Sequence, residues 1–220
     1  WITAYLMSLF TPEQLVRIMR SFGIEGQLDA VVSLCLGPCE VSVKEMVDAY
    51  TTFVNKGIKV EPMYVTRIED NKGNVISTFT PQYTEIISEE TSHKMLEMLK
   101  AVINEGTGVR LRYRYQFKGD IGGKTGTTQN NSDGWFIGVT PELVSGTWVG
   151  GEDRSIHFDN LREGQGASMA LPVWALYMQK VYADETLGYA DTLKFAIPQE
   201  KELEYKECVS NEIVEDLLFN

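Results

Sequence analysis

Apolar positions recur with a helical period over three stretches of the chain, and each stretch carries its own start and stop signals. In residues 11–23, Thr11 and Gln14 have the spacing of a capping box, with proline between them and glycine at the end. Residues 42–57 repeat this arrangement with serine, glutamate and glycine. Residues 88–104 begin with serine followed by two glutamates that suit the helix dipole. The pattern predicts three helices.

Strand-like alternation predicts hairpins elsewhere. Residues 62–80 are expected to form a hairpin that turns at residues 71–74. Residues 134–140 and 143–153 are expected to be two antiparallel strands that meet at a Pro-Glu turn. A helix with an early proline follows from residue 167.

The two ends of the chain differ in character. Residues 1–10 are apolar, lack the basic start of a signal peptide, and are expected to form a buried helix. No apolar run reaches the length of about 20 residues that a membrane span requires. From Asp184 onward the sequence is polar and acidic, which predicts a surface tail.

Composition narrows the functional classes. With 43% hydrophobic residues the chain can bury a core, so wholesale disorder is not expected. Its net charge of −11 argues against nucleic-acid binding, which needs a basic surface. Cys35, Cys39 and Cys208 show no metal-site spacing, and small buried apolar residues are their favoured interpretation. We expect no metal or cofactor.

The stretch "DIGGKTGTTQNNSDGWFIG", residues 120–138, admits three interpretations: a phosphate-binding loop, a plain hairpin, or one wall of an active-site cleft. A phosphate-binding loop requires glycine five residues before the Gly-Lys pair, and that position holds Lys118. A hairpin rather than a helix is also expected after Lys124, so no helix N-terminus would face a phosphate. The phosphate-binding interpretation therefore fails.

A cleft wall fits these residues better. Alternation on a strand places Thr125 and Thr127 on one side and Lys124 and Gly126 on the other. If the strand lies at a sheet edge, its backbone can pair with an extended peptide, and Gly126 permits close approach. Two hydroxyls can hold a carboxylate, and a lysine supplies positive charge. A Lys-Thr-Gly element of this kind occurs in β-lactamases and penicillin-binding proteins.

The surroundings of this element resemble class A, bifunctional penicillin-binding proteins. The match includes "GGKTGTTQNNSDGWFIGVTPELVSGTWVGGED", "EVSVKEMVDAYTTFVNKG", "VINEGTGVRLR" and "GASMALPVWALYM". It covers roughly residues 1–182, predicted as the C-terminal portion of a transpeptidase domain, and leaves residues 183–220 as an acidic tail. The implied fold is α+β, with an antiparallel sheet flanked by helices.

The resemblance implies a peptidoglycan D,D-transpeptidase that acts through an acyl-serine and is inhibited by β-lactams. The family nucleophile lies in Ser-x-x-Lys and a second motif is Ser-x-Asn, and no serine of this chain has either spacing. The only histidines, His93 and His157, have no sequence cue that links them to a serine. The chain is therefore expected to be a fragment that begins after Ser-x-Asn and is inactive alone.

The resemblance assigns roles to four residues. Lys124 would act electrostatically, Thr125 and Thr127 would bind the carboxylate of a stem peptide or β-lactam, and Gly126 would admit the ligand. The Thr127 amide would form half of the oxyanion hole. Partners would be peptidoglycan stem peptides, β-lactams and the rest of the same domain, with an upstream glycosyltransferase domain and membrane anchor, on the periplasmic, extracytoplasmic face of the bacterial inner membrane.

Three alternatives stay open: a monofunctional transpeptidase, a D,D-carboxypeptidase, and a nonenzymatic penicillin-sensing or binding domain of the same fold. A β-lactamase fits less well, because the strands after Lys-Thr-Gly resemble those of transpeptidases. Intact upstream motifs would favour an enzyme.

Other conspicuous residues have ordinary interpretations. Alternating arginines at positions 110, 112 and 114 predict a strand with a solvated face, although they could line a substrate path. Trp135 and Trp148 are expected in the core or under the cleft. "QNNSD" predicts a turn.

Overall fold

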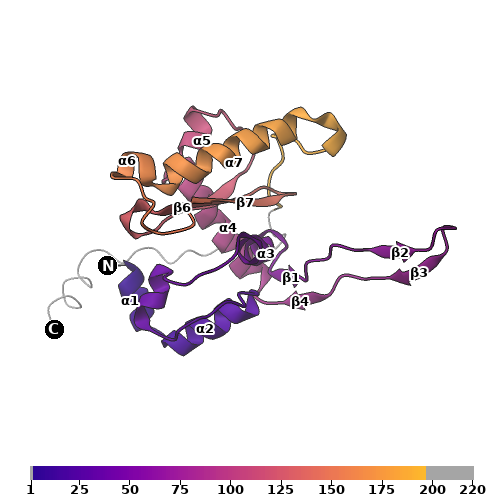
Figure 1. Ribbon diagram of the computed structural model, residues 1–220, viewed down its shortest axis with the longest axis horizontal. Coiled ribbons are helices and arrows are strands. Elements are labelled where there is room, and N and C mark those ends of the chain that lie inside the picture. The colour runs from indigo at the N-terminus through magenta and orange to yellow at the C-terminus, as the bar shows by residue number, and fades with distance from the viewer. Residues whose placement is uncertain (1, 197–220) are drawn as a thin grey trace.

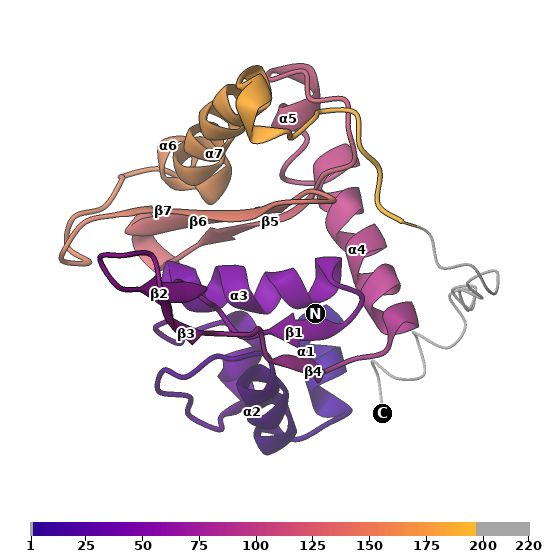
Figure 2. The same ribbon diagram turned by 90° about the vertical axis from the view of Figure 1, so that its right-hand side faces the viewer.

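The computed structural model describes residues 2–196 and arranges them in layers around a three-stranded antiparallel sheet (Figure 2). The sheet has the order β5-β6-β7; α7 with the short α5 covers one of its faces, α3 packs on the other, and α4 packs against β5 and contributes Leu99 to the α3 side and Ile103 to the core under α7. The bounds are β5 (Gly122–Thr127), β6 (Asp133–Val139), β7 (Val144–Gly150), α3 (Val43–Val54), α4 (Glu89–Asn104), α5 (Arg110–Tyr113) and α7 (Gly166–Ala183). The predicted α+β architecture with an antiparallel sheet is confirmed.

A second layer of short elements lies beyond α3, and a hairpin projects from it (Figure 1). β1 pairs with β4, and β2 pairs with β3 around a tight turn that includes Gly73 with a left-handed φ of 86°. The remaining elements are α1 (Ile2–Ser8), α2 (Pro12–Ser21), η1 (Val32–Leu36), β1 (Ile58–Val60), β2 (Arg67–Glu69), β3 (Val75–Thr78), β4 (Tyr83–Glu85), η2 (Gln129–Asn131), α6 (Leu161–Gly164) and η3 (Glu185–Leu187). Within the described residues, no helix is both long and apolar enough to cross a bilayer.

The capping residues read from the sequence begin their helices as predicted. Thr11 caps α2 with a complete capping box, and Ser42 caps α3 in the same way through Glu45. Hydrogen bonds from the Ser42 amide and hydroxyl, opposed by burial, lower the pKa of Glu45 to about 2. The same carboxylate accepts from the amides of Glu25 and Gly26, so it also fastens the preceding loop to α3.

The main core lies between α7 and the sheet. Trp174 is 1% exposed; its indole Nε1 donates to Ser145 Oγ at 2.7 Å, and its ring meets Phe136 at a centroid distance of 5.2 Å. Gly138 lies beneath that ring, and a Cβ at this position would overlap the indole. Trp174 therefore sets the distance between α7 and the sheet.

Three expectations about burial were wrong. Residues 2–8 form a helix, but Ile2 and Tyr5 are 78% and 53% exposed, and of the side chains described there only Met7 is buried. Cys35 and Cys39 are free and only half-buried, and that partial burial raises the pKa of the Cys39 thiol. Trp148 is 41% exposed, so it does not lie in the core, the first of the two positions expected for it.

The first residues of the predicted surface tail return to the body of the domain. The Asp191 carboxylate accepts hydrogen bonds from the amides of Lys118 and Gly119, and the Phe195 amide donates to Asp120 Oδ2. Phe195 is buried beside α4. Residues 184–196 are thus only partly a surface segment; Cys208 and the rest of the predicted tail, from residue 197, lie outside the described residues.

Candidate active-site wall on strand β5

Strand β5 carries the Lys-Thr-Gly element and occupies one end of the three-stranded sheet. Within residues 2–196 its hydrogen-bonded neighbour is β6 alone, so its other edge is open to an added strand. Gly122 and Gly123 let this edge strand lie close to α4 and β6. A Cβ at Gly122 would be 3.0 Å from the Leu99 Cβ, and one at Gly123 would be 2.9 Å from the Ile137 carbonyl oxygen.

Lys124 lies on the α3 face of the sheet. It is paired directly with Ile137, whose side chain points toward α3, and directly opposed residues of antiparallel strands share a face. The Lys124 side chain is exposed, and its Nζ donates to the Thr125 carbonyl oxygen at 2.6 Å. The ammonium group therefore lies over the open edge of β5, where a ligand strand would pair.

Thr125 and Thr127 lie on the opposite face, toward α7, as the alternation predicts. The Thr127 Oγ1 accepts a hydrogen bond of 2.9 Å from the Gly166 amide, which is the first residue of α7. This bond places the hydroxyl at the positive end of an 18-residue helix and leaves the hydroxyl hydrogen unused. Thr127 is thus arranged to donate toward an anion.

Gly126 has neighbours inside the chain that explain the absence of a side chain. A Cβ there would approach the Trp135 Cβ to 3.1 Å, because the two residues are directly paired across the strands. Gly166 is restricted more strongly, since a Cβ on it would overlap the Gly126 carbonyl oxygen. Close packing of α7 on this strand therefore depends on the glycine at position 166, whereas Gly126 accommodates the paired Trp135.

The predicted turn after β5 forms with two consecutive left-handed residues. Asn130 and Asn131 have φ angles of 59° and 56°, and asparagine tolerates this region well. The Asn131 carbonyl oxygen accepts from the Phe158 amide, so the turn is joined to the loop that precedes α6. Asp133, at the start of β6, has a buried Oδ1 without a hydrogen-bond partner among the described residues.

The arginines at positions 110, 112 and 114 do not form a strand, contrary to the prediction. Arg110 and Arg112 lie in the short helix α5. Arg110 donates to the Ala167 carbonyl oxygen and the Ser168 hydroxyl, and Arg112 donates to the carbonyl oxygens of Phe117 and Gly119. Because these bonds are internal, both guanidinium groups hold loops and the start of α7 in place.

One site residue was missed in the sequence. Thr107, in the loop between α4 and α5, has its Oγ1 2.7 Å from the Thr125 Oγ1. The signal that could have identified it is a Gly-Thr-Gly sequence directly after a helix and before the motif strand.

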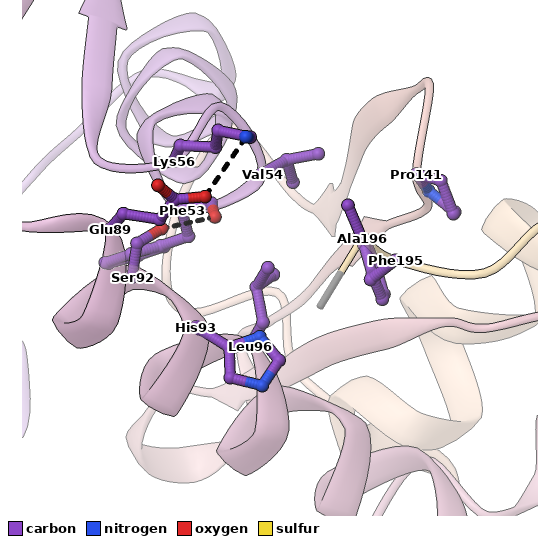
Figure 3. Close-up of a pocket in the computed structure, with 10 residues that line it drawn as sticks. All are labelled: Phe53, Val54, Lys56, Glu89, Ser92, His93, Leu96, Pro141, Phe195 and Ala196. Carbon is purple, nitrogen blue, oxygen red and sulfur yellow. Dashed lines mark hydrogen bonds and ion pairs between the residues drawn. The ribbon is translucent and has the colours of Figure 1, made fainter. Parts of the chain in front are cut away.

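A pocket of about 100 Å³ lies away from β5, between the end of α3, the first turns of α4 and residues 195–196 (Figure 3). Its polar side chains are largely paired with one another or with backbone: Lys56 with Glu89 at 3.1 Å, and Ser92 with the Phe53 carbonyl oxygen at 2.6 Å. His93 is buried there, and its Nδ1 has no hydrogen-bond partner among the described residues. This pocket lacks the open strand edge, so β5 remains the candidate site.

Comparison with known proteins assigns this arrangement to a family. Residues 25–150 match the model of the penicillin binding protein transpeptidase domain, which is more than half of the chain. Penicillin-binding protein 1A of Aquifex aeolicus is 31% identical over 169 residues, which are 77% of this chain and 22% of that protein. The chain thus spans less than a quarter of that relative.

Solved structures show the same fold. Penicillin-binding protein 1A of Haemophilus influenzae superposes with a TM-score of 0.75 at 23% identity, over 90% of this chain and 34% of that one. The PonA1 protein of Mycobacterium tuberculosis, solved in complex with penicillin V, gives a TM-score of 0.65 at 21% identity, over 90% and 56%. The predicted transpeptidase fold, present here in part, is confirmed.

Proposed function

Because this chain belongs to the penicillin-binding protein transpeptidase family, we propose that it supplies the Lys-Thr-Gly wall of a peptidoglycan D,D-transpeptidase cleft. The observation that carries the proposal is the geometry of β5. An open strand edge has an ammonium group on one face and two hydroxyls on the other, with one hydroxyl at the N-terminus of α7. An extended peptide that ends in a carboxylate fits such an edge.

In this proposal the rest of the protein contributes the serine nucleophile. Its Oγ attacks the carbonyl carbon between the last two D-alanines of a stem peptide, the terminal D-alanine leaves, and the acyl group passes to an amine of a neighbouring stem. Lys124 stabilises the charges that develop near the nucleophile, and the Thr127 amide forms half of the oxyanion hole. Thr125 and Thr127 bind the terminal carboxylate, and the carboxylate of a β-lactam takes the same place.

The proposal extends to the whole protein. Residues 1–182 would belong to the transpeptidase domain, preceded by a glycosyltransferase domain and a membrane anchor, with the cleft on the outer face of the bacterial inner membrane. Penicillin V bound to the PonA1 protein supports a β-lactam as ligand. A D,D-carboxypeptidase would release the acyl group to water, and a nonenzymatic sensor would retain it, so product analysis of the complete protein separates the three.

The chain by itself is expected to form no covalent adduct with penicillin. None of its serines has a lysine three residues later, so it contains no family nucleophile. Intact-mass spectrometry of the 220 residues after incubation with a fluorescent penicillin checks this expectation, with the complete protein as the positive control. A stoichiometric acyl adduct on the chain alone would refute it.

Replacing Thr125 by valine in the complete protein is expected to slow acylation by a carboxylate-bearing penicillin by roughly one to two orders of magnitude, because a charge-assisted hydrogen bond is lost. Valine keeps the shape and the strand propensity. The methyl ester of the same penicillin should lose much less, since it presents no anion.

Thr78→Val provides the matched control, because Thr78 is an exposed strand threonine in the projecting hairpin. It should leave both acylation rates unchanged. Equal losses for acid and ester in Thr125→Val would show that the threonine only shapes the strand.

A further inference from the structure

We infer that Thr107 is a positioning residue for carboxylate recognition, which it serves by fixing the direction of the Thr125 hydroxyl hydrogen. The inference rests on the proposed function, since it assigns a role to a residue that acts through Thr125. Three observations support it: the 2.7 Å separation of the two hydroxyl oxygens, the construction of the loop that carries Thr107, and the number of hydrogens available to the pair.

The loop holds Thr107 by close packing against the end of α4. Thr107 is flanked by Gly106 and Gly108, and a Cβ at Gly106 would be 2.9 Å from the Val102 Cα. The Gly108 amide donates to the Val102 carbonyl oxygen at 3.0 Å, and the Val109 amide donates to that of Gly106 at 3.2 Å. Two residues without side chains thus fold the loop back onto the helix and leave the threonine between them exposed.

Helix α4 also packs against β5, the strand that carries Thr125. The Ile103 Cδ1 lies 2.6 Å from the Cβ position of Gly108 and 3.2 Å from that of Gly123 in β5. One fully buried isoleucine therefore packs against both the Thr107 loop and the Thr125 strand. Core packing thus fixes the backbone of the Thr107 loop relative to the Thr125 strand, which brings the two hydroxyls within reach of each other.

The opposite end of the loop is tied to α7. Arg110 donates to the Ala167 carbonyl oxygen at 3.0 Å and to the Ser168 hydroxyl at 2.9 Å, both in the first turn of that helix. The Gly166 amide in the same turn binds Thr127. The loop, β5 and the start of α7 hence form one connected set of contacts around the two threonine hydroxyls.

A count of hydrogens determines the direction of the Thr107–Thr125 bond. Each hydroxyl has one hydrogen and two acceptor lone pairs, so between two bonded hydroxyls only one donates. A carboxylate accepts only, so a Thr125 that binds it must give its hydrogen to the ligand. Thr107 then has to donate to Thr125. This chain of bonds polarises the Thr125 hydroxyl and aims its hydrogen away from Thr107, toward the ligand.

A double-mutant cycle in the complete protein tests the inference, with acylation rates measured for a penicillin and for its methyl ester. Thr107→Val should lower the rate with the acid by about 3- to 10-fold, the scale of one neutral hydrogen bond, and the rate with the ester by less than about twofold. Thr107→Ser, which retains the hydroxyl, should restore the rate. In a Thr125→Val background, Thr107→Val should have no further effect, because the hydroxyl it orients is already gone.

Several outcomes would overturn the inference. An equal loss for acid and ester would assign Thr107 a general structural role, and losses that add in the Thr125→Val background would show that it acts independently of Thr125. If Thr125→Val slows acylation by the acid but Thr107→Val leaves that rate unchanged, only this inference is refuted. If Thr125→Val shows no loss specific to the acid, the assignment of Thr125 to carboxylate binding is refuted as well. If Thr107→Val does not fold, Thr107→Ala takes its place in the same cycle.

Discussion

Replacement of Lys124 by alanine in the complete protein is expected to slow acylation by penicillin by about a hundredfold or more, the usual scale for removal of one preorganised electrostatic group. The ammonium group lies at the open edge of β5, where the reacting carbonyl of an added strand would be placed. Folding should change little, because the Lys124 side chain is exposed and, among the described residues, its hydrogen bond is to the Thr125 carbonyl oxygen of its own strand. Stopped-flow measurement of the second-order acylation rate constant provides the test.

Lys72→Ala is the matched control for this substitution. Lys72 is an exposed lysine in the turn between β2 and β3, and this hairpin projects away from the three-stranded sheet (Figure 1). It should leave the rate unchanged, which separates the local effect of Lys124 from the loss of any one positive charge. If the acylation rate constant of Lys124→Ala lies within a factor of two of that of the unmodified protein, the Lys-Thr-Gly stretch is an ordinary hairpin without a role in the reaction.

The largest expected effect on stability is that of Trp174→Ala. This α7 side chain is 1% exposed and packs against Phe136 and Phe117, and its removal should cost about 3–5 kcal/mol in the free energy of unfolding. For a domain of this size the loss corresponds to a fall of roughly 10 °C in the midpoint of thermal unfolding. Scanning calorimetry of the complete protein would detect it as a shift of the transpeptidase transition.

Trp148→Ala removes the same kind of side chain from an exposed position and serves as the control. Because Trp148 is 41% exposed on the terminal strand β7, its loss should cost about 1 kcal/mol or less. Similar shifts for the two substitutions would contradict the assignment of the core to the space between α7 and the sheet.

The helices could be predicted from the sequence because their signals are local. Thr11, Ser42 and Ser88 each accept a hydrogen bond from the amide three residues later, so the residues that define the helix start lie within one turn of each other. The hairpin turn and the order of the last three strands were likewise predictable from nearby residues. Local chemistry determines these elements without help from the rest of the chain.

The wrong predictions concern secondary structure and burial that depend on residues distant in the sequence. Arg110 and Arg112 alternate as strand residues do, but they lie in a short helix, where their bonds extend to Ala167 in α7 and to the loop at residues 117–119. The exposure of Trp148 and of α1 depends on which surfaces pack together, and the hydrophobicity of a residue alone does not determine this. Tertiary contacts override the local pattern at each of these positions.

The motif of the candidate site could be predicted from the sequence, but the contacts that hold its threonines in place could not. The Lys-Thr-Gly strand and its alternation follow from six consecutive residues. The contact of Thr127 with the first residue of α7 joins positions 39 apart, and that of Thr125 with Thr107 joins positions 18 apart. No spacing rule reaches these pairs, because they depend on how α4 and α7 pack against the sheet. Their proposed roles toward a ligand remain predictions.

A crystal structure of the complete protein acylated by penicillin is the most direct test of the central claim, that β5 forms the ligand-binding wall of the cleft. We expect the ligand to lie along the open edge of β5, with its carboxylate oxygens about 3 Å from the Oγ1 atoms of Thr125 and Thr127. An acylated ligand whose carboxylate has no hydrogen bond to either threonine, or that lies away from β5, would contradict it.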